Sequence, residues 1–191
     1  MDGADAVMLS GETAAGAYPI ESIKAMASVV WEADQIVNMQ DSPNKEWNDE
    51  MHKAMSPNEQ ELDVVAASAV RSAQDKGAKM IVLITMSGQV ARAVARHRPT
   101  VPVVAFCTDP QVARRLQLHR SIHPFILQST LDPGSASTRM GFLRAEAVRT
   151  LKEAGWAQAG DRIIMVDRTQ GKSHDMHDVS HNMKVVTLRD S

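Results

Sequence analysis

The chain has one cysteine among its 191 residues, so it can form no disulfide within itself. It also has no apolar run near the ~20 residues that cross a membrane. Its first residues lack the basic start and long apolar stretch of a signal peptide. These absences exclude a disulfide-rich secreted domain and a membrane-spanning chain. The sequence therefore predicts a globular protein of a reducing, cytoplasmic compartment, with no membrane partner.

Two nucleotide-binding motifs are also missing. The sequence contains neither the G-x-G-x-x-G pattern nor a Walker A motif, so it gives little support to a nucleotide-binding α/β module of another family. The single thiol, Cys107, follows the apolar run Val103–Phe106. An apolar neighbourhood of this kind favours a buried structural thiol over a nucleophile.

The net charge of −2 is unevenly distributed along the chain. Residues 1–63 carry 13 acidic and 3 basic side chains, a net charge of −10, whereas residues 64–191 carry 10 acidic and 18 basic, a net charge of +8. A basic domain attracts nucleic acid or phosphorylated metabolites, because both are anionic. The basic residues are spread out, however, and no aromatic ladder accompanies them. This pattern disfavours nucleic acid and leaves two explanations open, cations around a phosphate-sized pocket and ordinary solvated helix surfaces.

A strand, a polar turn and a helix are predicted at the N-terminus. Ala6–Leu9 is a short apolar run that suits a buried parallel strand, and Ser10–Thr13 is a polar turn. A helix is expected from near Pro19 to residue 38, because proline suits the first helical turn and apolar residues recur after it with helical spacing. The block resembles the eighth and last βα unit of the pyruvate kinase barrel, whose pattern is close to DG(A/T)D-x-(V/I)-MLSGETA-x-G-x-YP.

A complete barrel of this type needs ~250 residues in eight βα repeats, and only one repeat is present here. We therefore expect residues 1–38 to be the remnant of a TIM barrel and the chain to be the C-terminal part of a longer enzyme. Residues 39–58 are polar and include Pro43 and Pro57. They are expected to connect the remnant to a second domain at residues 59–191.

Strands and helices alternate in the second domain. Apolar runs predict strands at 80–84, 101–106, 122–127, 162–166 and 183–188, and helical patterns occupy 59–76, 87–97, 111–118 and 135–154. This alternation predicts an α/β fold with a mostly parallel sheet and helices on both faces. The last two strands have no helix between them, so they are expected to form an antiparallel hairpin at the edge.

The resemblance to pyruvate kinase continues through this domain. Ile84–Pro99 is similar to the family segment T-x-(S/T)-G-x-(S/T)-A-x-x-(V/I)-(A/S)-(K/R)-(Y/H)-RP, and later blocks at 101–104, 120–125 and 160–161 are similar as well. The resemblance implies a glycolytic parent enzyme that transfers phosphate from phosphoenolpyruvate to ADP with Mg²⁺ and K⁺. It also implies homo-oligomers, because subunits of this family associate partly through this domain into tetramers.

The same resemblance implies catalytic roles for Ser10 and Glu12, which in the family order the water and proton network that protonates the enolate. The family's lysine, its metal-binding Glu and Asp pair and its substrate-binding arginine belong to motifs that this sequence lacks. Phosphoryl transfer depends on metal-bridged positioning, so we expect the chain alone to be inactive. The alternative is a stand-alone module that binds a phosphometabolite or drives oligomerisation without catalysis.

An anion-binding loop is predicted at Thr85–Gly88. It leaves a parallel strand and enters a helix, whose N-terminal N–H groups favour a phosphate. Thr85 and Ser87 would add hydroxyl groups and Gly88 would allow close approach, although Ser87 is equally explained as an ordinary N-cap. In family members regulated by sugar phosphates, this loop holds an effector phosphate.

Three residues in this region depart from the strongly regulated animal members of the family. Met86 and Gln89 stand where those members carry Lys and Arg, and Val90 replaces a hydroxyl residue. Charge-assisted contacts are worth roughly 1.5–3 kcal/mol each. The sequence therefore predicts weak or altered regulation by sugar phosphates, with much reduced affinity for fructose 1,6-bisphosphate.

The segment Asp167–Asn182 occupies the place of the family's effector loop. It keeps Gly171 and Lys172, which the resemblance assigns to effector phosphate binding. It also contains three histidines and two aspartates, at His174, His177, His181, Asp175 and Asp178. These side chains could coordinate a metal, but a loop gives them no common face, so we favour incidental exposed histidines and expect no metal site.

Overall fold

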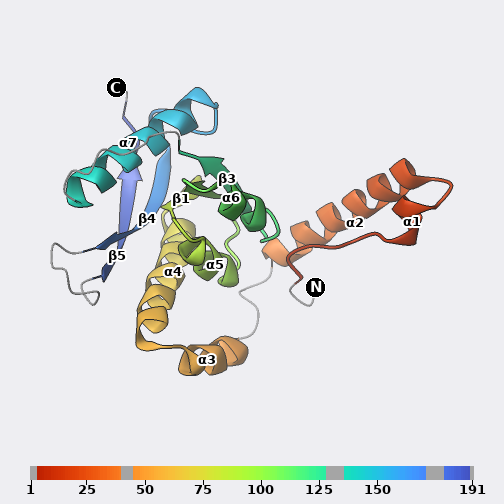
Figure 1. The fold of residues 1–191 in the computed structure, drawn as a ribbon, viewed down its shortest axis with the longest axis horizontal. Coiled ribbons are helices and arrows are strands. Elements are labelled where there is room, and N and C mark those ends of the chain that lie inside the picture. The colour runs from red at the N-terminus through yellow and green to blue at the C-terminus, as the bar shows by residue number, and fades with distance from the viewer. Residues whose placement is uncertain (1–3, 40–44, 128–135, 171–178, 190–191) are drawn as a thin grey trace. The chain divides into compact units, whose positions relative to one another are not determined.

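The structure is a computed structural model that describes residues 4–39, 45–127, 136–170 and 179–189. The chain divides into two compact units, Met1–Glu46 and Trp47–Ser191. Each unit is described by itself below. Figure 1 shows the elements and their labels.

The first unit is helical in its described residues. It contains the short helix α1, Gly11–Ala14, and the long helix α2, Pro19–Met39. The prediction of a strand at Ala6–Leu9 is wrong, because these residues form no strand and Val7 and Met8 are 57% and 83% exposed. A strand of a parallel sheet exists only through pairing with neighbours, and the described residues of this unit supply none. The predicted helix after Pro19 is confirmed.

Two helices precede the sheet of the second unit. Helix α3, Lys45–Ala54, lies inside the segment that was expected to be a connector, and helix α4 spans Pro57–Asp75. Ser56 caps α4 through a capping box, in which Glu59 Oε2 accepts from both the backbone N–H and the hydroxyl of Ser56, at 3.0 and 2.6 Å. The domain limits expected at 38 and 58 remain a prediction.

The core of this unit is a five-stranded sheet in the order β3-β2-β1-β4-β5. Its strands are β1 Met80–Ile84, β2 Val103–Cys107, β3 Ile122–Ile126, β4 Arg162–Gln170 and β5 Val179–Thr187. The first four are parallel, and β5 pairs with β4 in the antiparallel sense. The predicted α/β class with an antiparallel edge hairpin is confirmed.

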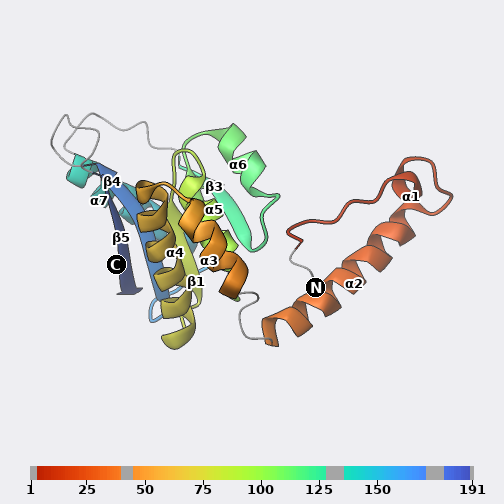
Figure 2. The ribbon, with the colours of Figure 1, turned by 90° about the horizontal axis from the view of Figure 1, so that it is seen from below.

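Helices cover both faces of the sheet, as predicted. The connecting helices are α5 Gln89–Arg96, α6 Pro110–Leu116 and α7 Ala136–Glu153. Alternate residues of β1 point to opposite sides, so Ile81 and Leu83 pack with α4, α5 and α6, whereas Val82 and Ile84 pack with α7. In Figure 2, α4 and α5 lie in front of the strands and α7 behind them.

The direction of each connection explains this division of helices. Crossovers between parallel strands are right-handed, so the steps β1 to β2 and β2 to β3 place α5 and α6 on one face. The connection from β3 to β4 runs back across the sheet, and α7 therefore lies on the opposite face. None of the helices in the described residues is both long and apolar enough to cross a bilayer.

Candidate functional site

The strand order reverses between β1 and β4, which are neighbours in the sheet. In open α/β sheets, ligands bind in the crevice beyond the carboxyl ends of the strands at such a reversal. The two segments that leave these strand ends are the Thr85–Gly88 loop after β1 and the residues from Asp167 onward in β4. Topology therefore brings together two of the segments that the sequence singled out.

The Thr85–Gly88 loop is tightly closed. Thr85 is buried, its N–H donates to the carbonyl oxygen of Phe106 at 2.9 Å, and its Oγ1 accepts from the N–H of Gly88 at 3.0 Å. Gly88 has a φ of +79° and is the N-cap of α5, which begins at Gln89. The alternative explanation of Ser87 as the N-cap is therefore wrong, and its exposed side chain is not used as a cap.

An arginine that the sequence analysis did not single out lies against this loop. Arg92 Nη1 donates to the carbonyl oxygen of Ser87 at 3.2 Å, and a Cβ added to Gly88 would lie 3.0 Å from the same nitrogen. The position of Arg92, four residues after the N-cap, is the sequence signal that could have identified it. Met86 is 63% exposed and Val90 is buried in the core. The loop therefore has one guanidinium beside it, even though Met86 carries no charge.

On β4, Asp167 is held by an arginine of α7. Its side chain is completely buried, and it accepts two hydrogen bonds of 2.7 Å, from Nε and Nη2 of Arg144. The hydrogen bonds to Asp167 raise the pKa of Arg144 above its usual value. The predicted effector residues Gly171 and Lys172, with His174 and His177, lie outside the described residues.

A groove of about 640 Å³ lies between the start of α4, α3 and β5. It is lined by His52, Pro57, Gln60, Glu61, Val64, Val65, Ser180 and His181. Burial and the charge of Arg168 lower the pKa of His181, against the opposing charge of Glu61. Across the described part of the chain, no three His, Cys, Asp or Glu side chains come together in a way that could hold a metal ion.

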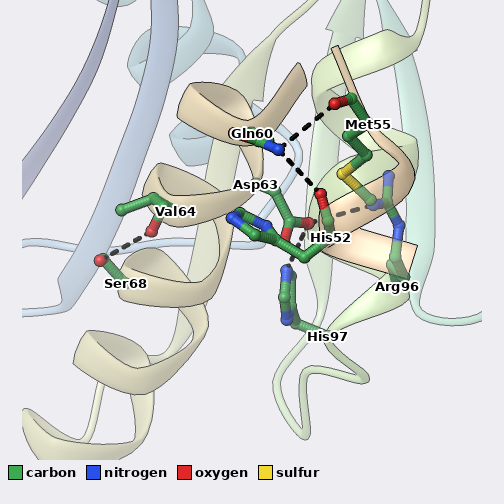
Figure 3. A network of polar contacts seen from close by, with 8 residues as sticks. All are labelled: His52, Met55, Gln60, Asp63, Val64, Ser68, Arg96 and His97. Carbon is green, nitrogen blue, oxygen red and sulfur yellow. Dashed lines mark hydrogen bonds and ion pairs between the residues drawn. The ribbon is translucent and has the colours of Figure 1, made fainter. Parts of the chain in front are cut away.

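A buried carboxylate joins three helices beside this groove (Figure 3). Asp63 of α4 lies 3.1 Å from His52 Nδ1 of α3 and 2.9 Å from His97 Nε2, and Arg96 Nη1 of α5 donates to it at 3.1 Å. Gln60 also donates to the backbone carbonyls of His52 and Met55 at 3.1 and 3.3 Å. The sequence analysis did not identify this cluster.

The ionisation of Asp63 reflects opposing influences. Burial raises its pKa, but the hydrogen bond and charge of His97, followed by the hydrogen bond of His52 and the charge of Arg96, outweigh burial. The pKa of Asp63 therefore lies below its ordinary value. The carboxylate stays charged at neutral pH and holds α3 and α5 against α4.

In the first unit, Ser10 and Glu12 lie on one exposed turn at the start of α1. The N–H of Ser10 donates to Glu12 Oε2 at 3.0 Å. Backbone hydrogen bonds from Glu12 itself and from Ser10 lower the pKa of Glu12, so its side chain is a carboxylate at neutral pH. The two predicted catalytic residues are therefore neighbours in space as well as in sequence.

The single thiol is buried at the end of β2, as predicted. Cys107 has no exposed surface, and burial, together with the charge of Asp109, raises its pKa to about 11. A thiol with this pKa is almost fully protonated at neutral pH, and the thiolate is the reactive form. The prediction of a buried thiol is confirmed.

The fold is that of an open α/β domain whose strand order reverses between β1 and β4, the place where sheets of this kind bind ligands. The family described as "Pyruvate kinase, alpha/beta domain" matches residues 63–184. Pyruvate kinase 2 of Candida glabrata is 35% identical over 174 residues, which cover 90% of this chain and 32% of that protein. A pyruvate kinase of Lachancea kluyveri is 31% identical over 192 residues, covering 98% of this chain and 36% of that protein.

A solved structure gives the same result. Cryptosporidium parvum pyruvate kinase in complex with ADP matches with a TM-score of 0.66 and 27% identity, over 95% of this chain and 33% of that one. The chain belongs to the pyruvate kinase family and contains its C-terminal α/β domain. It spans about a third of the length of these relatives.

Proposed function

We propose that the whole protein is a pyruvate kinase that transfers phosphate from phosphoenolpyruvate to ADP, and that this chain supplies its effector-binding and assembly domain. The main support is the match of the α/β domain over residues 63–184. In the whole protein, Ser10 and Glu12 would order the water and proton network near the enolate. A cytoplasmic location fits a Glycine max relative, 33% identical, that is called a cytosolic isozyme.

Mg²⁺ and K⁺ are proposed for the whole enzyme, where Mg²⁺ would neutralise the charge that develops on the transferred phosphoryl group. The described residues do not fit a divalent metal, because no three ligands converge among them.

The chain alone is expected to form no pyruvate from phosphoenolpyruvate and ADP in the presence of Mg²⁺ and K⁺. The physical reason is that metal-bridged positioning supplies most of the catalysis in phosphoryl transfer. The measurement is a coupled assay of the purified 191-residue chain, with full-length pyruvate kinase as the positive control. Turnover that persists after rigorous removal of host enzyme would contradict this proposal.

The effector role is assigned to the loop at the strand reversal. Thr85, Ser87 and Gly88, with Gly171 and Lys172, are proposed to bind a phosphate group, and Arg92 donates a hydrogen bond to the loop backbone. Because Met86 is uncharged and Val90 is buried, we propose weak affinity for fructose 1,6-bisphosphate. A bisphosphate Kd in the low micromolar range, measured on the whole enzyme, would contradict the weak regulation.

Gly88→Ala is expected to weaken inorganic phosphate binding by about tenfold, the equivalent of one charge-assisted hydrogen bond. The new Cβ would lie 3.0 Å from Arg92 Nη1 and 3.2 and 3.3 Å from Leu116 and Val112, so the guanidinium must move. The measurement is a calorimetric titration of the chain with phosphate.

The matched control for this substitution is Gly155→Ala. Gly155 has a φ of +73°, close to the +79° of Gly88, but an added Cβ there meets nothing within 4 Å. In both variants an alanine in the left-handed conformation costs about 1–2 kcal/mol, whereas only Gly88→Ala disturbs the loop. Equal phosphate affinity in the two variants would remove the loop from the proposed site.

The second candidate function is a stand-alone module that binds a phosphometabolite or forms homo-oligomers without catalysis. The observation in its favour is that the α/β unit has its own buried core on both faces of the sheet. Analytical ultracentrifugation of the chain separates the two functions of this module. A homo-oligomer supports assembly, and a monomer that still binds phosphate supports the binding role.

A further inference from the structure

The groove between α3, α4 and β5 is a cavity that the proposed function does not use. In Figure 2, α3 and β5 lie to either side of α4, and all three elements contribute to the lining of the groove. Its lining residues are separate from the Thr85–Gly88 loop. A volume of about 640 Å³ is in the range of small-molecule sites.

Contacts on two sides hold the walls of the groove in place. Gln60 donates to the backbone carbonyls of His52 and Met55 at 3.1 and 3.3 Å, which holds the end of α3 against α4. On β5, His181 and Met183 point to the same face of the sheet, because alternate residues of a strand do so. Met183 packs against the hydrophobic core on the α4 face. The groove is therefore formed by contacts within the chain and does not need a ligand to shape it.

One imidazole of the groove has a fixed hydrogen-bonding state. Asp63 is a carboxylate at neutral pH and can only accept hydrogen bonds, so His52 Nδ1, 3.1 Å away, must carry a proton (Figure 3). In the neutral ring, Nε2 then keeps its lone pair and is an acceptor. The side chain of His52 is 36% exposed and lines the groove. With Nδ1 engaged by Asp63, the polar atom that His52 can offer to a ligand is the acceptor Nε2.

The other polar groups of the groove add acceptors and one negative charge. Apart from the two histidines, Glu61 is the only acidic or basic residue among the described lining residues, and it is exposed. Gln60 uses its amide nitrogen on the two carbonyls, which leaves its side-chain oxygen as an acceptor. His181 is neutral at pH 7, because burial and the charge of Arg168 lower its pKa. Such a lining favours a ligand that donates hydrogen bonds and carries a positive charge.

An apolar surface adjoins these acceptors. Val64 and Val65 follow Glu61 by three and four residues, so both are its neighbours on the surface of α4. Val65 packs against the core, whereas Val64 is 56% exposed beside the groove. The exposed valine offers a contact to the apolar part of a ligand.

We propose that this groove is a second ligand site that binds a small organic amine in its ammonium form, with the charged group at Glu61 and His52 and the apolar body against Val64. A primary ammonium group has three donors and no acceptor, which complements this wall of the groove. Arg168 pairs with His181 across the hairpin and lies on the same face. Its charge disfavours a cation at the β5 wall, so the ammonium group is placed at the α4 wall. The site depends neither on the proposed phosphate loop nor on catalysis.

Titration of the isotopically labelled 191-residue chain with benzylamine at pH 7, followed by NMR, tests the site. We expect a Kd on the order of 1 mM, the largest amide shifts around the groove, and nuclear Overhauser effects between the ligand ring and the Val64 methyl groups. Benzyl alcohol has the same ring but no charge and is expected to bind about fivefold more weakly. Equal binding of the two compounds, the largest shifts outside the groove, or no binding of benzylamine up to about 20 mM would each overturn the proposal.

Glu61→Gln tests the charged contact without changing the shape of the side chain. It is expected to weaken benzylamine binding by about threefold to fivefold, the upper range for an exposed ion pair, and to leave benzyl alcohol binding unchanged. Glu153→Gln is the matched control, because Glu153 is 69% exposed and lies on α7, which packs on the other face of the sheet. Equal benzylamine affinity in the two variants would remove Glu61 from the site and contradict the proposed recognition of a cation.

Val64→Lys tests the position of the ligand, because it places an ammonium group of the chain itself at the groove. It is expected to weaken benzylamine binding by more than about tenfold. The control is Ser68→Lys, which adds the same charge at an exposed position one turn further along α4, outside the lining of the groove. The NMR spectrum of each variant shows whether it is folded. Equal binding by the two folded lysine variants would mean that benzylamine does not occupy the groove.

Discussion

Asp63→Asn is expected to lower the free energy of unfolding by about 2–3 kcal/mol, in the range for hydrogen bonds to charged groups. Asparagine keeps the volume of the side chain but removes its charge and one acceptor oxygen. Asp63 is 8% exposed and holds three partners from two other helices, so the partners would lose charge-assisted bonds at once. The measurement is urea denaturation at pH 7, compared through the midpoint and slope.

The effect of this substitution should depend on pH, because the pKa of Asp63 is lowered in the folded chain. A lowered pKa means that the folded state binds the proton more weakly than the unfolded state, where the value is near ~3.9. The stabilisation by Asp63 is therefore fully present above the unfolded pKa and is lost as the pH falls through the folded pKa. The difference between the two proteins should shrink as the pH falls below about 4.

Asp75→Asn is the control for the same chemical change on the same helix. Asp75 is half exposed and its partner Arg71, one turn away, is 76% exposed. Exposed pairs of this kind contribute about 0.3–0.5 kcal/mol. If the two substitutions cost the same, the cluster around Asp63 does not hold α3 and α5, and the interpretation given above is wrong.

The strands of the second unit could be predicted from the sequence because they are buried on both faces. All five residues of β1 and all five of β2 are buried, and such strands read as continuous apolar runs. Helix α7 was recognisable from its length and from Gly155, which has a φ of +73° just after it. Strands that are buried on both faces and a glycine that ends a helix can therefore be recognised in the sequence.

Two elements were predicted wrongly, and the physical reasons differ. Ala6–Leu9 looks like a buried strand, but a strand needs a paired neighbour, and local sequence cannot supply one. Helix α3 was missed because its segment is polar on average and is flanked by Pro43 and Pro57, although Trp47, Met51 and Ala54 recur in it with helical spacing. The end of α3 is held by contacts with α4. The His52 ring contacts the carboxylate of Asp63, and the side chain of Gln60 donates to the backbone carbonyl of His52.

The candidate site could be predicted only in part. The residue types of the loop were recognisable, because threonine, serine and glycine after a strand favour an anion. The cap was assigned to the wrong residue, since only the backbone shows that Gly88 takes the left-handed conformation. The partners of Asp63 and Asp167 lie 11 to 34 residues away in sequence, so spacing alone gives no sign of them.

Phe106→Ala is expected to lower the free energy of unfolding by about 3–5 kcal/mol, the usual cost of deleting a buried aromatic side chain. Phe106 has no exposed surface and packs on the α7 face, where its ring lies 5.5 Å from that of Phe125. Phe142→Ala removes the same atoms from a side chain that is 67% exposed and is expected to cost less than about 0.5 kcal/mol. Thermal and urea unfolding of both variants provide the measurement.

The same variant also tests whether the loop depends on the backbone of β2 or on its side chains. Thr85 is held by the carbonyl oxygen of residue 106, a bond that alanine retains. Since β2 is paired with a strand on each side, its backbone should keep its place when the ring is removed. We therefore expect a large loss of stability but phosphate affinity within about twofold of the original under conditions where the variant is folded. A parallel loss of affinity would mean that the cavity lets β2 shift, and that packing on the α7 face, rather than strand pairing alone, positions the loop.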